Sequence, residues 1–244
     1  MPFTFSHPAI VLPFSYLPKR WVSMAGLITG SMVPDFEYFM RMRVKSIYSH
    51  TWPGLLWFDL PLGLLIMFVY QKLVKDELID HLPTVLNQRF TKFKGTYKKA
   101  YSFQYWVVVA ASILVGAVSH IVWDGFTHPN GYFVLGMPIL SNIIRLGGHQ
   151  LYVYKVIQHA STLIGAIVIV TVVYTLPLSA HKTKRHIVGF WIQVVSAVVI
   201  VLVIRLNTGL TFHQYGDIIV TMIAGGLLGL IMASIMAHIK MKAA

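Results

Sequence analysis

Five long apolar runs constrain the fold of this chain more than any other feature of its sequence. A helix that crosses the hydrocarbon core of a bilayer needs about 20 mainly apolar residues. Five runs qualify or come close: Gly54–Leu73, Tyr105–Trp123, Val156–Leu178, Ile187–Ile204 and Gly216–Ile239. Only 11% of the 244 residues are charged, whereas a soluble domain carries about 25%. We therefore expect an all-α fold, a polytopic membrane helix bundle with five full transmembrane helices.

Two shorter apolar stretches precede the first long run. Pro8–Leu17 and Trp21–Val33 are too short to span comfortably, and a Pro-Lys-Arg turn separates them. We interpret them as a short N-terminal helical hairpin that enters the membrane and returns. Backbone at membrane depth must satisfy its hydrogen bonds internally, so this hairpin must pack against the other helices. We predict a single integral membrane domain over residues 1–244, in which residues 1–53 form the hairpin and an outer loop.

The Lys and Arg residues indicate an orientation. Fourteen of the 20 fall on one side of the predicted topology, seven of them between Lys72 and Lys99. The positive-inside rule places that side in the cytoplasm. Residues 75–104 are then a basic cytoplasmic loop whose partner is anionic lipid. This explains the net charge of +12 without nucleic acid, for which we find no binding motif.

The opposite, outer face collects side chains that bind metals. Five of the eight acidic residues map to it: Asp35, Glu37, Asp59, Asp124 and Asp217. Asp59 lies about 7 Å inside the first full span, at a rise of 1.5 Å per residue. The chain has no cysteine, which excludes thiolate zinc sites and cysteine nucleophiles.

The strongest local signal is the pair His120 and Asp124 at the outer end of the second full span. Residues four apart on a helix share one face, about 6 Å apart along the axis. A histidine and a carboxylate at that spacing can ligate one metal or two neighbouring metals, such as zinc, iron or manganese. Gly125 and Pro129 then end the helix and leave His128 at its mouth. The alternative is that His120 and Asp124 only form an internal hydrogen bond.

Three further residues are expected at this face. Pro34 ends a helix and presents Asp35, and His50 comes immediately before the first full span. His7 begins the hairpin and reaches the outer face only if the hairpin returns as predicted. Asp35 has the alternative of capping a structural element. Asp59 has the alternative of pairing with an Arg or a hydroxyl for packing.

The sequence resembles an uncharacterised bacterial membrane-protein family over essentially its whole length. The opening MPFTFSHPA, Gly30–Phe39, Ser49-His50-Thr51, Pro53-Gly54 and Ser119–His128 carry the resemblance. That family is similar to the membrane-bound metal-dependent hydrolases of bacterial inner membranes. More distantly, Ser119–His128 resembles the His-x-x-x-Asp helix of zinc-dependent phospholipase C. The resemblance implies a multi-pass inner-membrane protein with the following metal ligands: His7, Asp35, His50, His120 and Asp124. The distribution of Lys and Arg predicts that this site faces outward.

The leading hypothesis is a metal-dependent hydrolase that holds one or two divalent ions, most naturally zinc. Its substrate would be a lipid or lipid-linked ester or phosphoester that diffuses in the leaflet. Glu37 is the expected base or supporting residue, with Asp59 behind it and His128 as a further catalytic residue. A GxSxG nucleophile motif does not occur in the sequence.

Two alternatives remain open. One is an ion or metal transporter, or a metal-binding membrane protein without hydrolase activity; the other is a structural membrane protein in which the polar cluster stabilises packing. Transport sites lie near the bilayer midplane, so depth separates the first alternative from an enzyme. The sequence does not indicate an oligomeric state.

Overall fold

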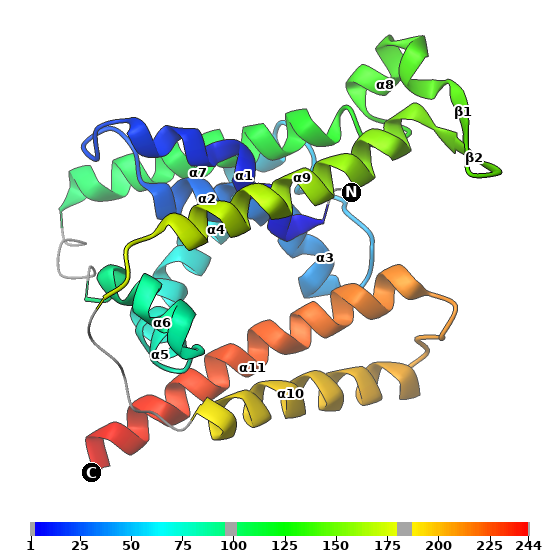
Figure 1. Ribbon diagram of the computed structural model, residues 1–244. Coiled ribbons are helices and arrows are strands. Elements are labelled where there is room, and N and C mark those ends of the chain that lie inside the picture. The colour runs from blue at the N-terminus through cyan, green and yellow to red at the C-terminus, as the bar shows by residue number, and fades with distance from the viewer. Residues whose placement is uncertain (1–2, 96–101, 180–186, 244) are drawn as a thin grey trace. The chain divides into compact units, whose positions relative to one another are not determined.

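A computed structural model describes residues 3–95, 102–179 and 187–243. Within these ranges, five helices are long and apolar enough to cross a membrane: Leu55–Asp80, Phe103–Asp124, Val153–Thr175, Ile187–Asn207 and Tyr215–Lys240. The predicted all-α bundle with five full spans and a short N-terminal hairpin is therefore confirmed (Figure 1). Five of the 14 Lys and Arg residues counted on the cytoplasmic side lie outside the described residues: Lys98, Lys99 and the three from Lys182 to Arg185.

The first span continues past its predicted end at Leu73. It comprises a π-helical stretch at Leu55–Asp59, α4 (Leu60–Val69), a second π-helical stretch at Tyr70–Val74, and α5 (Lys75–Asp80). The connection predicted at residues 75–104 is thus partly helical. It also contains α6 (Thr84–Phe90) and a 3₁₀ turn at Thr91–Phe93, while residues 96–101 lie outside the described part.

Contacts between Cα atoms divide the chain into two compact units. The first comprises Met1–Asp35, Ile47–Leu64 and Ser102–Tyr174; the second comprises Phe36–Ser46, Leu65–Tyr101 and Thr175–Ala244. The single domain over residues 1–244 stays a prediction.

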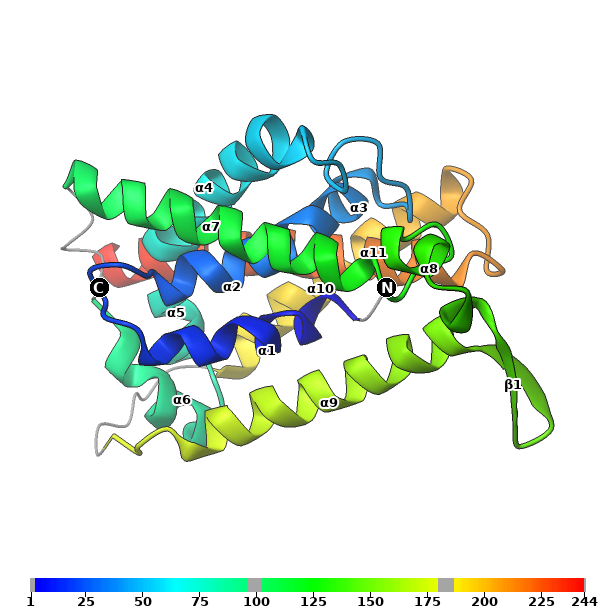
Figure 2. The same ribbon diagram turned by 90° about the horizontal axis from the view of Figure 1, so that it is seen from above.

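The first unit contains the hairpin. Its arms are α1 (Pro8–Val11), extended by a 3₁₀ turn at Leu12–Tyr16, and α2 (Met24–Met32). The hydroxyl of Ser23 caps α2 by accepting a hydrogen bond from the backbone N–H of Gly26. Both arms pack against α7 (Phe103–Asp124), and Figure 2 shows α1 between α7 and α9 (Val153–Thr175).

Small residues bring α2 and α7 unusually close. A Cβ atom added to Gly30 would lie 2.1 Å from the carbonyl oxygen of Ile113, and one added to Gly116 would lie 2.4 Å from that of Leu27. Glycine is required here because any side chain would separate the two backbones, as at other small-residue helix crossings in membranes. The crossing sets the distance between the end of α2 and the end of α7.

Residues 125–152 join α7 to α9 through structure that we did not predict. They contain α8 (Tyr132–Gly136), a 3₁₀ turn at Pro138–Ser141, and the antiparallel strands β1 (Ile143–Leu146) and β2 (His149–Tyr152). Gly147 and Gly148 form the turn with φ of +54° and +83°. Two residues with positive φ suit a tight hairpin whose twist matches its strands.

The second unit is built on an antiparallel pair of long helices, α10 (Ile187–Asn207) and α11 (Tyr215–Ala243) (Figure 1). Phe190, Val194 and Ala233 form its buried core. The short α3 (Phe36–Arg41) and α5 also contact α11.

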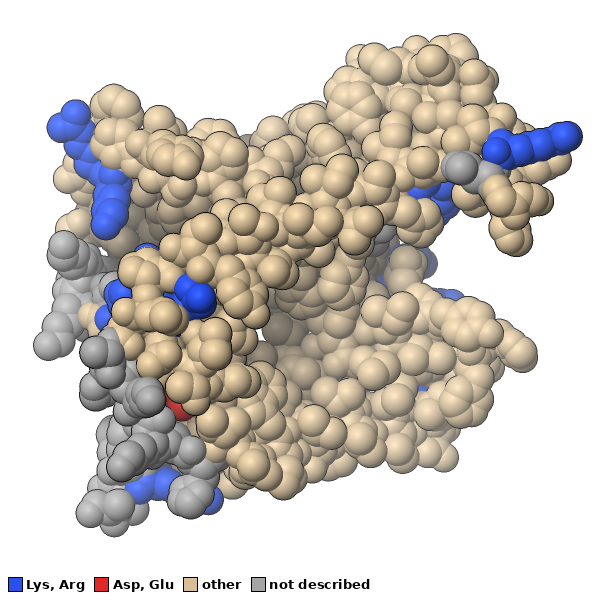
Figure 3. Space-filling view, viewed as in Figure 1, with Lys and Arg blue, Asp and Glu red and all other residues tan. Residues whose placement is uncertain are grey.

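The surface of α9 is the one a lipid environment requires. Only 11% of the 18 most apolar consecutive residues of α9 are buried, and Lys155 is its single Lys, Arg, Asp or Glu residue. Leu163, Ile164 and Ile167 are each more than half exposed. In Figure 3 its exposed surface is accordingly almost entirely uncharged. An apolar helix surface of this length fits a bilayer and not water.

Candidate metal centre

Four side chains in the first unit offer ligand atoms that all lie within 4.8 Å of one another: Asp35, His50, His120 and Asp124. Asp35 ends a 3₁₀ turn that follows α2, and His50 lies in the loop before the first span. His120 and Asp124 share a face in the last turns of α7. Four of the five predicted ligands are thus brought together from three separate parts of the chain.

The separations in this group suit a small cation. The Nε2 atom of His120 lies 3.5 Å from Oδ1 of Asp35 and 3.4 Å from Oδ2 of Asp124. The Nε2 atom of His50 lies 3.5 Å and 3.6 Å from the same two oxygens. Direct N–H···O bonds are shorter, at about 2.7–3.2 Å. Ligands at about 2.1 Å from a tetrahedral zinc are roughly 3.4 Å apart, so these four nitrogen–oxygen separations are close to those between zinc ligands.

The orientation of His120 gives a second reason to expect a cation. Its Nδ1 atom lies 2.7 Å from the carbonyl oxygen of Ser31. A carbonyl only accepts hydrogen bonds, so Nδ1 carries the proton, and Nε2 of the neutral ring directs a lone pair at the carboxylates. Among the described residues, Nε2 of His120, Oδ1 of Asp35 and both oxygens of Asp124 are buried without a hydrogen-bond partner. Facing lone pairs repel one another unless a positive charge lies between them.

Further contacts orient the proposed ligands. The hydroxyl of Thr4 donates a 2.5 Å hydrogen bond to Oδ2 of Asp35, the oxygen that faces away from the two histidines. The hydroxyl of Ser49 lies 3.0 Å from Nδ1 of His50. Such outer contacts fix ligand orientation in metal sites. Sequence reasoning missed Thr4, although it lies three residues before His7, a spacing that aligns side chains in a 3₁₀ turn.

His7, the fifth predicted ligand, is buried beside this group. Its ring stacks on that of His120, with centroids 3.8 Å apart, and its Nε2 lies 3.6 Å from Oδ1 of Asp124. The Oδ2 atom of Asp124 therefore faces His50 and His120, and its Oδ1 atom faces His7. Ser6 and Phe3 hold this segment in place through hydrogen bonds to Thr162 on α9. His7 lies beside this group because the hairpin returns to the end of α7, as predicted.

His128, which we predicted as catalytic, lies at the edge of the group. Its Nδ1 atom is 3.0 Å from the backbone carbonyl oxygen of Asp124 and 3.7 Å from Oδ2 of the same residue. Its side chain is 30% exposed, whereas that of His120 is fully buried. His128 is therefore the histidine of this end of α7 that reaches solvent.

The other two predicted catalytic residues are placed differently. Glu37 belongs to the second unit, where its Oε1 pairs with Arg41 at 2.8 Å and its Oε2 accepts a 3.1 Å hydrogen bond from Ser46. A carboxylate held in this way is poorly suited to accept a proton. Asp59 is fully buried in the first turns of the first span and is not a member of the four-residue group.

The electrostatics favour positive charge at the centre. Burial, and any positive charge on the stacked ring of His120, lower the pKa of His7 to about 3. Burial opposes ionisation of Asp35, but His120 and His50 outweigh it and hold its pKa well below the usual range. Burial likewise opposes protonation of His50, yet the carboxylates of Asp124 and Asp35 raise its pKa. An ionised carboxylate is therefore stabilised by whatever positive charge lies beside it.

Comparison with known proteins identifies a family and no function. No curated protein and no solved structure matches the chain. One family, described as a domain of unknown function (DUF4184), matches residues 1–235. This match covers nearly the whole chain, including every residue of the centre described above. The chain therefore belongs to the DUF4184 family.

Proposed function

We propose that this protein is a membrane-embedded, metal-dependent hydrolase of a lipid or lipid-linked ester or phosphoester. The observation that carries the proposal is the convergence of two carboxylate oxygens and two imidazole nitrogens in a buried group. Neutral imidazole and carboxylate are ligands for zinc, iron and manganese, and zinc is our first choice. His7, on the second oxygen of Asp124, provides a ligand for a second ion.

The residues of the centre have two roles in the proposed reaction, metal binding and proton transfer. Asp35, His50, His120 and Asp124 would hold the ion, and a bound ion would supply Lewis acidity to polarise the ester and to acidify water. The ring of His128 lies between Asp124 and solvent, where it can exchange a proton with water entering the centre. Because the carboxylate of Glu37 is engaged by Arg41, His128 replaces it as our preferred base.

The depth of the centre favours an enzyme over a transporter. Asp124 is the last residue of α7, so the group lies at one end of a spanning helix. Transport sites are expected near the bilayer midplane, with access from both sides. A centre at the boundary suits a lipid headgroup and water together. From the distribution of Lys and Arg we further propose that the protein resides in a bacterial cytoplasmic membrane with this end facing outward.

Metal analysis of detergent-purified protein tests the site. We expect at least one zinc or similar ion per chain in the wild type and none in His120→Ala or Asp124→Ala. His149→Ala is the matched control, because that histidine is exposed on β2 and should leave the metal content unchanged. A wild type without stoichiometric metal, or retention of metal in both variants, would overturn the proposal.

A substrate screen then tests the reaction. Lipid esters and phosphoesters should turn over with the metal-loaded protein, lose turnover when a chelator is added, and regain it when zinc is restored. Stoichiometric metal with no turnover of any such substrate would favour the alternative, a metal-binding or transport protein.

A further inference from the structure

The connection between α7 and α9, residues 125–152, has one packed face and one exposed apolar face. On the packed face, Val134 and Leu140 are buried against Tyr154. On the other face, Tyr132, Leu135 and Ile139 are 82%, 71% and 66% exposed. Such a cluster is too apolar to be an ordinary water-facing loop.

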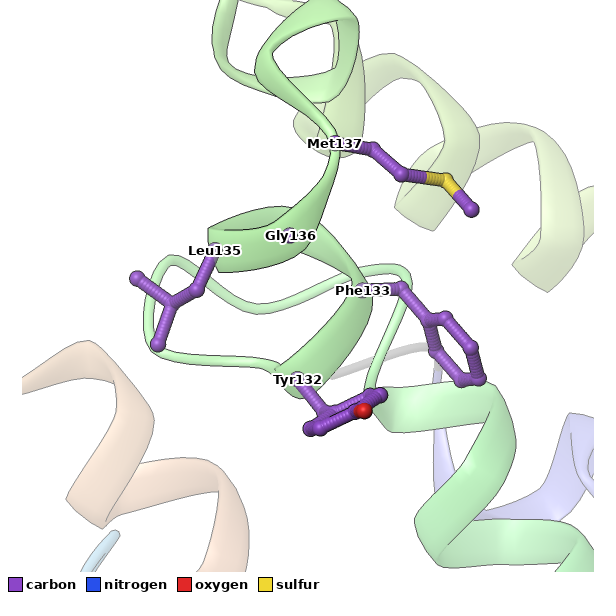
Figure 4. A pocket seen from close by; sticks show the side chains of 5 residues that line it. All are labelled: Tyr132, Phe133, Leu135, Gly136 and Met137. Carbon is purple, nitrogen blue, oxygen red and sulfur yellow. The ribbon is translucent and has the colours of Figure 1, made fainter.

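An open cavity of about 600 Å³ adjoins α8 and is lined by Tyr132, Phe133, Leu135, Gly136 and Met137. Figure 4 shows these residues around the short helix. The lining contains one hydroxyl group and no charged side chain. Its volume falls in the range of roughly 300–1,000 Å³ that is typical of small-ligand sites. A ligand without charge and with flexible apolar length suits this lining.

α8 is tied closely to the metal centre. The backbone N–H groups of Phe133 and Val134 both donate to the carbonyl oxygen of Gly125, the residue that follows Asp124. The ring of Phe133 stacks on that of Phe126 with centroids 3.9 Å apart. A ligand beside α8 is therefore held at a fixed position relative to the last turn of α7.

The position and composition of the connection indicate which medium covers its exposed face. It begins and ends at helices long and apolar enough to cross a membrane, so both of its ends lie at the same membrane boundary. Its 28 residues include no Asp, Glu or Lys and a single Arg, Arg145. An apolar face next to tyrosines and a positive charge is typical of elements that lie in the bilayer interface.

We propose that the exposed face of residues 132–143 lies in the membrane interface, and that the cavity beside α8 takes an acyl chain of a bilayer lipid. The part of this inference that makes that lipid the substrate rests on the proposed function. The chain of the lipid would anchor beside α8 while its headgroup ester reaches the metal centre from the leaflet.

Spin labelling tests the membrane contact independently of any activity. The chain has no cysteine, so Leu135→Cys and Ile139→Cys each introduce a unique labelling position. In phosphatidylcholine–phosphatidylglycerol vesicles, both nitroxides should collide more with oxygen than with a water-soluble nickel chelate. Gln150→Cys, exposed on β2, is the control and should show the reverse. If labels at 135 and 139 are as accessible to nickel as the label at 150, the proposal is wrong.

A charge in the cavity tests the role in substrate binding. Leu135→Glu should reduce turnover of long-chain lipid esters by about tenfold or more, because an acyl chain in the cavity would have to desolvate the introduced carboxylate. Metal content should stay at the wild-type level, turnover of short, water-soluble esters should fall much less than that of long-chain esters, and Gln150→Glu should change neither the metal content nor the turnover. Equal losses on short and long substrates would overturn the acyl-chain assignment. Absence of all turnover would refute the hydrolase and leave the labelling result to decide membrane contact.

Discussion

The substitution Gly30→Ala should disable the metal centre without touching any of its ligands. The added methyl group would lie 2.1 Å from the carbonyl oxygen of Ile113, so α2 and α7 must separate by about 1.3 Å to reach the 3.4 Å of ordinary contact. The link between Ser31 and Nδ1 of His120 crosses this interface at 2.7 Å, and an equal displacement would break it. Loss of an outer contact of this kind typically costs 10–100-fold in metal affinity, so we expect at least that loss.

The expected effect of Gly30→Ala is a loss, whereas helix propensity alone predicts that alanine stabilises the helix. The two explanations therefore predict opposite results. Alanine in place of glycine favours an isolated helix by about 1 kcal/mol, whereas forced overpacking typically costs about 1–3 kcal/mol. Gly226→Ala on α11 is the matched control, because its added methyl group meets only ordinary contact at 3.8 Å. Gly26→Ala, with its closest contacts at 3.0 Å, should give an intermediate effect.

The assay is a competitive chelator titration of each variant, with size-exclusion chromatography to establish that the protein stays monodisperse. If monodisperse Gly30→Ala binds metal as tightly as Gly226→Ala, then the close approach of α2 and α7 does not set the geometry of the centre.

Three further predictions concern the same centre. Thr4→Val removes the hydrogen bond to Asp35 and should weaken metal binding about 10–100-fold in a chelator titration, whereas Thr171→Val, at an exposed position of α9, should not. His7→Ala should lower the number of bound ions from two to one, or weaken binding, in elemental analysis; complete loss, as expected for His120→Ala, would show that His7 is indispensable to the first ion. Removing the metal from a solution in which free metal stands at 100 times its dissociation constant should cost about 2.7 kcal/mol of stability, seen as a lower thermal midpoint; an unchanged midpoint would mean that no ion is bound to the folded state.

The sequence predicted the parts of this structure that depend on local periodicity. Apolar runs identify the five spans because bilayer thickness sets their length, and the four-residue spacing places His120 and Asp124 on one face of α7. The hairpin was predictable in outline because Pro8–Leu17 and Trp21–Val33 are each too short to span. Their ends shift by a few residues, as helix boundaries do when caps such as Ser23 decide them.

Contacts between distant segments were not predictable in the same way. The carbonyl of Ser31 contacts His120 because α2 and α7 approach so closely. Thr4 contacts Asp35 because the N-terminal segment packs against the turn after α2, and both contacts are tertiary. The hairpin of β1 and β2 had a visible signal, Gly147-Gly148 between two apolar stretches, that we did not use. The same holds for Glu37, whose spacing of four residues from Arg41 on one helix predicts the ion pair that engages it.

The ligand set has a consequence for how this chain assembles. Asp35, His50 and Asp124 belong to three separate segments of the sequence, and Asp124 is the last residue of its helix. A bound ion would act as a cross-link among them, closing two long loops of chain whose closure otherwise costs entropy. Metal binding and folding are coupled wherever the site does not exist in the unfolded chain. Maturation of the first unit would then be completed by metal loading, after its helices have already inserted into the bilayer.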